Sequence, residues 1–153
     1  MKLHNSTDRI EKEIVLRAPR SRVWRALADV EQFGAWFGMK FVGGWAPGSR
    51  AHAQFALPGK GDVTIEIAIE RMDPESSLSY RWHPYALEPG VDYSNEPTTL
   101  VEFHLEEVAG GTRLTVVESG FDRIPPARRA EAIRMNDAGW AEQLENIARY
   151  VAE

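Results

Sequence analysis

The segment PARRAEAIRMNDAGWAEQLENIARYVAE, at residues 126–153, has the pattern of one long amphipathic helix that ends a strand-rich chain. Its apolar side chains recur at steps of 7, 4, 3 and 4 residues and share one helical face: Ile133, Trp140, Leu144, Ile147 and Val151. Asn136 and Asp137 fill the gap in this stripe. A buried, unpaired acid is costly, so Asp137 indicates a polar partner, a wet cavity or a fraying helix end.

Most of the chain before this helix alternates between apolar and polar residues, which is typical of strands with one buried face. The pattern predicts strands at residues 9–17, 39–45, 50–57, 62–70, 78–83, 101–105 and 114–118. Two short helices are expected at residues 21–30, with Ser21 as N-cap, and 31–37. Residues 84–97 have no period and are expected to form a long loop.

Together these elements predict an α+β fold. A curved antiparallel sheet of about six or seven strands would be wrapped around the long C-terminal helix, with two short helices after the first strand. At 153 residues the chain fits a single domain, residues 1–153, with its core at about 9–152.

Composition excludes several classes of function. The formal net charge of −5 argues against nucleic-acid binding, and the arginines near the last helix are expected to form a solvated face: Arg123, Arg128, Arg129 and Arg134. Without any cysteine the chain has no disulfide and no thiolate nucleophile. The N-terminus lacks a signal-peptide core, and no apolar run approaches the ~20 residues that span a bilayer. A cytoplasmic protein without membrane insertion is therefore expected.

Several short motifs, in this order and spacing, resemble the START-like (SRPBCC) helix-grip superfamily and its AHSA-type branch, named for homology to an activator of a heat-shock-protein ATPase. The resemblance covers residues 9–152 and rests on these segments: Ala18-Pro19, Val23-Trp24-Arg25-Ala26-Leu27-Ala28-Asp29, Trp36-Phe37, Gly110-Gly111-Thr112-Arg113-Leu114, Glu118-Ser119-Gly120-Phe121, and Gly139-Trp140 with Leu144 and Tyr150.

The resemblance implies a central cavity between the sheet and the long helix, often for an apolar or aromatic small molecule. It implies no single activity, because the wider superfamily includes lipid carriers, hormone receptors, cyclases and oxygenase domains. It calls for no cofactor here, since the chain has no Cys/His iron–sulfur motif. It leaves open a homodimer or a chaperone as a protein partner.

Two acids are candidates for chemistry. Glu118 shares the inward face of its strand with Leu114 and Val116, and Asp137 lies in the stripe of the last helix. If both reach the cavity, their repulsion raises at least one pKa and makes an acid/base pair. The alternative is structural: Glu118 bonds to a nearby loop backbone or arginine, and Asp137 caps a loop or pairs with an arginine or tyrosine.

Aromatic residues at strand and helix periods are expected to point inward, either as core or as a ligand cage. The predicted ligand-binding set combines them with the two acids: Trp36, Trp45, Phe55, Tyr80, Trp82, Phe103, Glu118, Asp137 and Trp140. No residue is assigned as catalytic. No metal site is expected, because the strand histidines all have outward parity: His52, His83 and His104.

The favoured function is therefore a small-molecule binding protein with a mostly apolar internal cavity. Two rivals remain. One is a cavity enzyme of cyclase or hydrolase type that uses Glu118 or Asp137 as its base. The other is a protein-interaction module with a chaperone as partner, which would need an exposed apolar patch.

Overall fold

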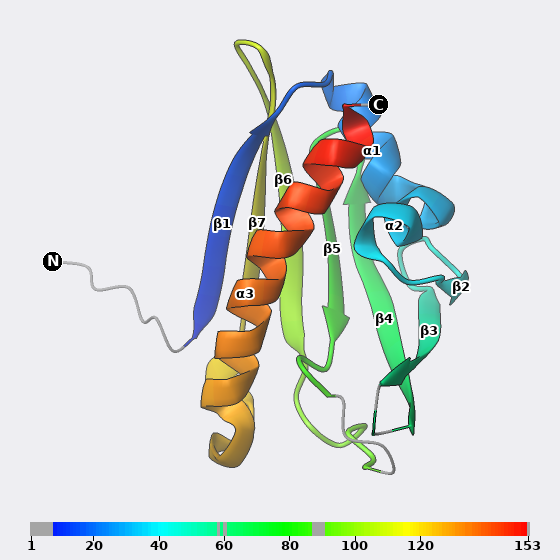
Figure 1. The fold of residues 1–153 in the computed structure, drawn as a ribbon, viewed down its shortest axis with the longest axis vertical. Coiled ribbons are helices and arrows are strands. Elements are labelled where there is room, and N and C mark those ends of the chain that lie inside the picture. The colour runs from blue at the N-terminus through cyan, green and yellow to red at the C-terminus, as the bar shows by residue number, and fades with distance from the viewer. Residues whose placement is uncertain (1–7, 58, 60, 87–90, 153) are drawn as a thin grey trace, which may run out of the picture.

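The computed structural model describes residues 8–57, 59, 61–86 and 91–152, apart from the side chains of Phe55 and Leu57. The long helix α3 (Pro126–Val151) lies against one face of a single antiparallel sheet (Figure 1). Two short helices, α1 (Arg20–Ala28) and α2 (Val30–Phe37), cover the same face beside it. The result is the predicted α+β helix-grip arrangement.

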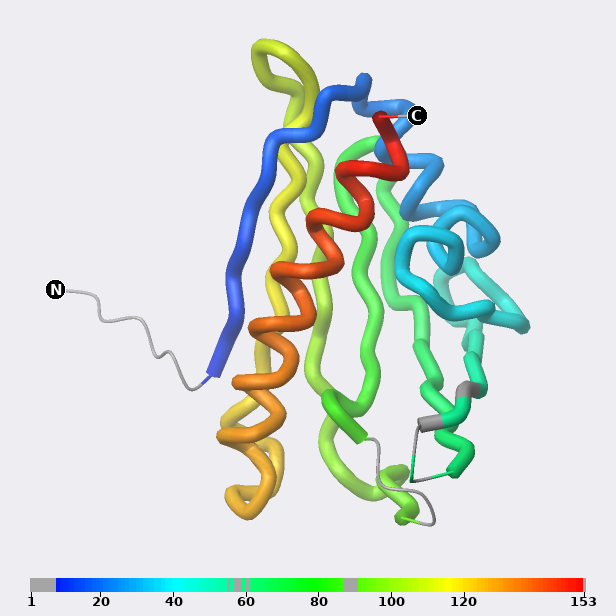
Figure 2. Tube along the Cα trace, viewed as in Figure 1, coloured from blue at the N-terminus to red at the C-terminus, as the bar shows by residue number. Residues whose placement is uncertain are grey.

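Seven strands form the sheet, in the order β1-β7-β6-β5-β4-β3-β2. Their bounds are β1 Arg9–Leu16, β2 Val42–Gly43, β3 Arg50–Leu57, β4 Gly61–Asp73, β5 Ser77–Trp82, β6 Thr99–Val108 and β7 Gly111–Ser119. Strands β2 to β7 follow one another as a meander, whereas β1 pairs with β7, the last strand of the chain. Figure 2 shows β1 at one edge of the sheet, with α3 passing across its neighbours.

Several predicted boundaries differ from those of the structure, and two of these differences change the local structure. The strand expected at 39–45 shrinks to Val42–Gly43, because the Met39 N–H bonds to the Gly34 carbonyl and closes α2 instead of joining a strand. The first short helix begins at Arg20 with Pro19 as N-cap, and the Pro19 carbonyl accepts the first N–H bonds. Ser21 therefore lies inside the helix.

The apolar stripe of α3 is confirmed over its C-terminal half, where Trp140, Leu144, Ile147 and Val151 are buried. Each such side chain contributes ~1.5–3 kcal/mol through burial. Beside this stripe, Phe33 of α2 lies at the centre of an aromatic cluster, with ring centroids at 4.8 Å from Trp36, 4.9 Å from Trp45 and 5.1 Å from Phe37. Dense packing of this kind holds α2 against the sheet.

None of the helices in the described part of the chain has the length and apolar character that a membrane crossing needs.

Candidate functional site

The sheet register gathers four polar-tipped side chains on the face that α3 covers: Tyr80, Trp82, Thr99 and Glu118. Glu118 of β7 lies opposite Val101 of β6, which in turn lies opposite Tyr80 of β5. Trp82 lies two residues after Tyr80, and Thr99 lies two residues before Val101, so strand alternation points both to the same face as Glu118. This polar group meets α3 at Asn136 and Trp140.

Glu118 is completely buried, with 0% exposure, and accepts hydrogen bonds from four side chains. One oxygen, Oε2, accepts from Thr99 Oγ1 at 2.6 Å and from Trp82 Nε1 at 2.8 Å. The other, Oε1, accepts from Trp140 Nε1 at 2.8 Å, and Asn136 Nδ2 spans both oxygens at 3.0 and 3.2 Å. The arginine or loop backbone expected as its partner is replaced by these four donors. Because a buried carboxylate is costly unless it is hydrogen-bonded, they stabilise Glu118 inside the fold.

All four donors to Glu118 are neutral, so its negative charge is stabilised by dipoles rather than by an opposite charge. The charge acts on Tyr80, which is also fully buried: burial, and then the proximity of Glu118, raises the pKa of Tyr80 well above its ordinary value. The Tyr80 hydroxyl has no hydrogen-bond partner among the described residues. Because its pKa is raised, the hydroxyl stays protonated. Because it is buried without a partner, it lowers the stability of the fold.

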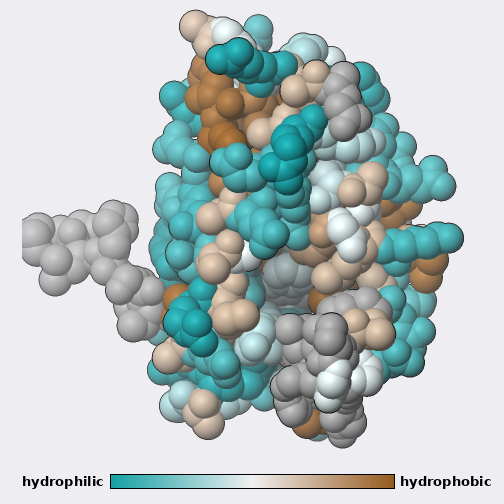
Figure 3. Space-filling model, in the orientation of Figure 1, coloured by the Kyte–Doolittle hydropathy of each residue, from teal (hydrophilic) through white to brown (hydrophobic). Residues whose placement is uncertain are grey.

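A recess of about 230 Å³ opens between α3, the end of α2 and strands β4 and β5. Figure 3 shows a hollow at this place on the face of the molecule. Apolar and aromatic side chains predominate in its lining, which consists of Phe37, Met39, Ile65, Trp82, His83, Tyr85, Ala86, Asn136, Gly139, Trp140 and Gln143. The volume is below the usual ~300–1,000 Å³ of ligand pockets but exceeds the ~150 Å³ of an apolar cavity that binds benzene.

Gly139 contributes to this space. It lies in the interior of α3, where a glycine costs ~0.5–1 kcal/mol relative to alanine. A Cβ atom built there would meet no other group within 4 Å, so close packing does not require a glycine. The missing side chain leaves room that is part of the recess.

Asp137 does not point into the recess, and the expectation that it borders the cavity is wrong. Its side chain is 55% exposed and pairs with Lys12 of β1 at 3.3 Å. The residue that occupies the inward gap in the stripe of α3 is Asn136. The condition for an acid/base pair, that Glu118 and Asp137 both reach the cavity, is therefore not met, because the two carboxylates lie in different environments.

The remaining predicted site residues divide into three groups. Trp82 and Trp140 line the recess, with ring centroids 5.9 Å apart. Tyr80 and Phe103 are fully buried beneath it, whereas Trp36 and Trp45 belong to the cluster around Phe33. The indole N–H groups of Trp36 and Trp45 donate to the backbone carbonyls of Ala26 and Leu27, respectively.

The Phe55 side chain lies outside the described part of the chain.

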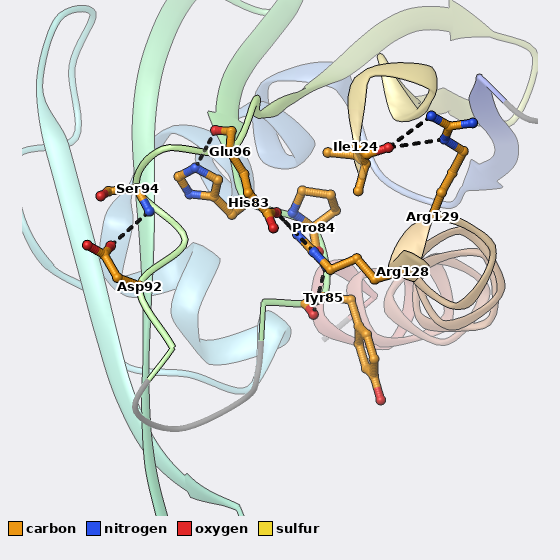
Figure 4. Close-up of polar contacts among 9 residues, drawn as sticks. All are labelled: His83, Pro84, Tyr85, Asp92, Ser94, Glu96, Ile124, Arg128 and Arg129. Carbon is orange, nitrogen blue, oxygen red and sulfur yellow. Dashed lines mark hydrogen bonds and ion pairs between the residues drawn. The ribbon is translucent and has the colours of Figure 1, made fainter. Parts of the chain in front are cut away.

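Arg128 of α3 ties the loop after β5 to the helix (Figure 4). Its guanidinium donates to Glu96 Oε1 at 2.6 and 3.0 Å and to the Pro84 carbonyl at 2.7 Å. It also lies over the Tyr93 ring, 4.9 Å from the centroid. The Arg128 side chain is only 19% exposed, so the prediction of a solvated arginine face is wrong at this position, although it holds for Arg134.

The same loop is ordered by two further contacts. His83 Nε2 lies 3.0 Å from the Glu96 carbonyl, and the Ser94 N–H donates to Asp92 at 2.9 Å. The Ser94 bond lowers the pKa of Asp92. His83 is half-buried at the wall of the recess, so its predicted outward position is wrong, whereas His52 and His104 are exposed. Within the described residues no group of three His, Asp or Glu side chains is placed to hold a metal ion.

Sequence reasoning missed several residues of the recess: Met39, Ile65, His83, Gly139 and Gln143. A signal existed for Gly139, since a glycine inside a strong helical pattern needs a reason. None existed for His83, because strand β5 ends at Trp82 and alternation no longer sets the direction of the next side chain.

The chain is similar in fold to several solved structures. Protein MLL2253 from Mesorhizobium loti aligns with a TM-score of 0.74 and 23% identity, covering 94% of this chain and 96% of that one. The Aha1 dimer from Colwellia psychrerythraea gives 0.68 and 17%, covering 94% and 95%. DynU16, from the dynemicin biosynthetic locus, gives 0.71 and 25%, covering 95% of this chain but 47% of its own length. Thus this chain spans about half of DynU16.

Among curated proteins, none matches this sequence. The family described as "Activator of Hsp90 ATPase homolog 1-like protein" matches residues 17–152, which include every helix and most of the sheet. The chain therefore belongs to the Activator of Hsp90 ATPase homolog 1-like family.

Proposed function

We propose that this protein binds a small, mostly apolar, aromatic molecule in the recess beside α3. The observation that carries the proposal is the open space at Gly139, walled by Trp82, Trp140 and Phe37. Aromatic rings pack favourably against such walls in offset or edge-to-face geometry. The similarity to DynU16, from a biosynthetic locus, is compatible with a small-molecule role.

The Glu118 network supports this role by holding the walls in place. Trp82 and Trp140 come from different elements, and both indoles donate to the same carboxylate. Their ring positions are therefore determined before any ligand arrives, which lowers the entropic cost of binding.

A cavity enzyme with Glu118 as its base has weaker support. A general base must come within hydrogen-bonding distance of the proton that it removes. Glu118 is buried behind Trp82, Asn136 and Trp140, and both of its oxygens already accept bonds from the protein. Asp137 is paired with Lys12 outside the recess.

A docking surface for a chaperone or for a second copy also has weaker support. The family description and the dimeric Colwellia protein are the reasons to consider it. Among the described residues, the exposed large apolar side chains are on four separate parts of the chain: Val15, Val42, Val91 and Met135. Scattered apolar residues of this kind are normal on a monomer surface.

Filling the recess tests the proposed function. Gly139→Leu would place an apolar side chain in the open space, and Ala138→Leu would add the same chain on the exposed face of α3. The wild-type protein and both variants would be titrated with one-ring and two-ring aromatic compounds while the Trp82 and Trp140 indole signals are followed by NMR. Trp36 and Trp45, which lie outside the recess, serve as internal references.

We expect the wild type and Ala138→Leu to bind members of the panel and Gly139→Leu to lose that binding. Gly139→Leu should remain folded, because leucine favours the helix over glycine by ~0.8 kcal/mol. If no compound shifts the two indole signals in the wild type, or if Gly139→Leu binds as the wild type does, the proposal is wrong.

A further inference from the structure

Most of the side chains with hydrogen-bond donors that line the recess already donate to protein acceptors. Trp82 and Trp140 donate to Glu118, and Gln143 Nε2 donates to the Phe37 carbonyl. An indole nitrogen has a single N–H, so neither tryptophan has a second bond to offer a ligand.

Asn136 is held in one orientation by the same network. Its Nδ2 lies against both Glu118 oxygens, and a carboxylate requires a donor there. The amide oxygen, Oδ1, is consequently the acceptor end of the group. It belongs to a half-buried side chain that lines the recess.

His83 has the same bias. One ring nitrogen, Nε2, lies 3.0 Å from the Glu96 carbonyl, which only accepts, so Nε2 carries the proton. In the neutral ring the other nitrogen is an acceptor. Tyr85 is the remaining lining side chain with a hydroxyl that can donate.

The charge of the surroundings acts in the same direction. Three recess residues, Trp82, Asn136 and Trp140, touch Glu118 directly, so one side chain separates a ligand from a carboxylate that has only neutral partners. The nearby Lys12 is paired with Asp137 and does not offset this charge. A buried negative charge at such range is weakly screened and repels anions.

We infer that the recess selects neutral aromatic molecules that carry a hydrogen-bond donor, such as phenols, and rejects aromatic carboxylates. The inference rests on the proposed function and adds the chemical class of its ligand. A phenol O–H supplies the donor that Asn136 Oδ1 lacks, whereas a carboxylate brings a second negative charge and two further acceptors.

Three ligands of similar shape provide the test: 4-ethylphenol, 4-ethylbenzoate and 4-ethyltoluene. Each is titrated into the full chain at pH 7.5 by NMR, with the Trp82 and Trp140 indole signals as reporters. We expect 4-ethylphenol to bind at least about tenfold more tightly than 4-ethylbenzoate, and more tightly than 4-ethyltoluene. The substitution Asn136→Leu is nearly isosteric. In this variant the affinity for 4-ethylphenol should fall to the affinity for 4-ethyltoluene, which should still bind.

The outcomes separate the two proposals. Equal affinity for all three compounds, or tighter binding of 4-ethylbenzoate, would overturn the ligand class and leave the proposed function standing. An unchanged preference for 4-ethylphenol in Asn136→Leu would also overturn it. If none of the three compounds binds, both proposals fail.

Discussion

In two neighbouring regions on the same face of the sheet, the indole N–H groups of the tryptophans have different kinds of hydrogen-bond acceptor. In the cluster around Phe33, Trp36 and Trp45 donate to carbonyls of Ala26 and Leu27, near the end of α1. Carbonyls at the end of a helix lack intrahelical partners, so these two bonds use groups that are free in any case. Beside the recess, Trp82 and Trp140 both depend on one acid, Glu118.

The two regions differ in whether their tryptophans share one hydrogen-bond acceptor. Each tryptophan of the Phe33 cluster has its own acceptor, and losing one bond leaves the other intact. The donors around Glu118 share a single acceptor, so they form a network in which each member fixes the others. We expect the first region to respond to substitutions independently and the second to respond as a unit.

Among single substitutions in the two regions, we expect Glu118→Leu to destabilise the protein most. It leaves four donors without an acceptor, two on the buried residues Thr99 and Trp140 and two on the half-buried residues Trp82 and Asn136, and each orphaned buried donor costs ~1–3 kcal/mol. We expect the free energy of unfolding in urea to fall by about 4 kcal/mol or more. Glu107→Leu, at an exposed position of β6, is the control and should change little. A loss below ~1 kcal/mol for Glu118→Leu would show that the network does not stabilise the fold.

Double-mutant cycles measure how strongly residues are coupled in each of the two regions. Glu118→Gln and Trp140→Phe act on one hydrogen bond, so their effects on unfolding free energy should deviate from additivity by about 1–3 kcal/mol. Trp45→Phe and Trp140→Phe act on rings with different neighbours and should add within ~0.5 kcal/mol. Both cycles are measured by urea unfolding, and equal coupling in the two would contradict the distinction between the regions.

Tyr80→Phe should have a smaller effect, and of the opposite sign. The Tyr80 hydroxyl is buried without a partner among the described residues, so its removal should raise the free energy of unfolding by about 1 kcal/mol. Because the pKa of Tyr80 is raised in the folded state, the unfolded chain loses this proton first as pH increases. Stability of the wild type should therefore fall above pH ~10, by up to ~1.4 kcal/mol per pH unit from this group.

The free energy of unfolding, measured from pH 8 to 11 for the wild type and for Tyr80→Phe, checks this prediction. The difference between the variant and the wild type should grow above pH ~10. A constant difference across this range would mean that Tyr80 does not titrate in the way that its burial requires.

Asp137→Asn should have the smallest effect. The Lys12–Asp137 pair is half exposed, and exposed ion pairs contribute ~0–1 kcal/mol. We expect the melting temperature and ligand titrations of this variant to match those of the wild type closely. A large loss of ligand binding would instead show that Asp137 takes part in the ligand site, which would contradict its position beside β1.

Much of the fold could be predicted because it follows from local periodicity. The stripe from Trp140 to Val151 and the alternation in β4 and β7 each depend on the spacing of apolar residues within one segment. The inward direction of Glu118 follows from the same rule, since it shares a face with Val116. The strand predicted at residues 39–45 was wrong over most of its length, because the helix C-cap at Gly38 uses backbone groups that a strand would need.

The candidate site could be predicted only in part, because its residues come from elements that meet through tertiary packing. Trp82 and Trp140 were identified as inward aromatics, but nothing local indicates that they share an acceptor with Thr99. Arg128 shows the same limit. Its spacing places it among surface arginines, and only the return of the loop after β5 brings Glu96 and the Pro84 carbonyl to it.

Local helix geometry is enough to give α3 an apolar face with a polar gap at Asn136 and Asp137, since a helix of 3.6 residues per turn places both beside the stripe. Which of the two faces the interior depends on tertiary packing. The pairing of β1 with β7 sets Lys12 against Asp137 at the sheet edge and Glu118 against Asn136 beneath the helix. The cation draws the acid outward, and the buried carboxylate takes the amide, because a carboxylate needs a donor and a second acid would repel it.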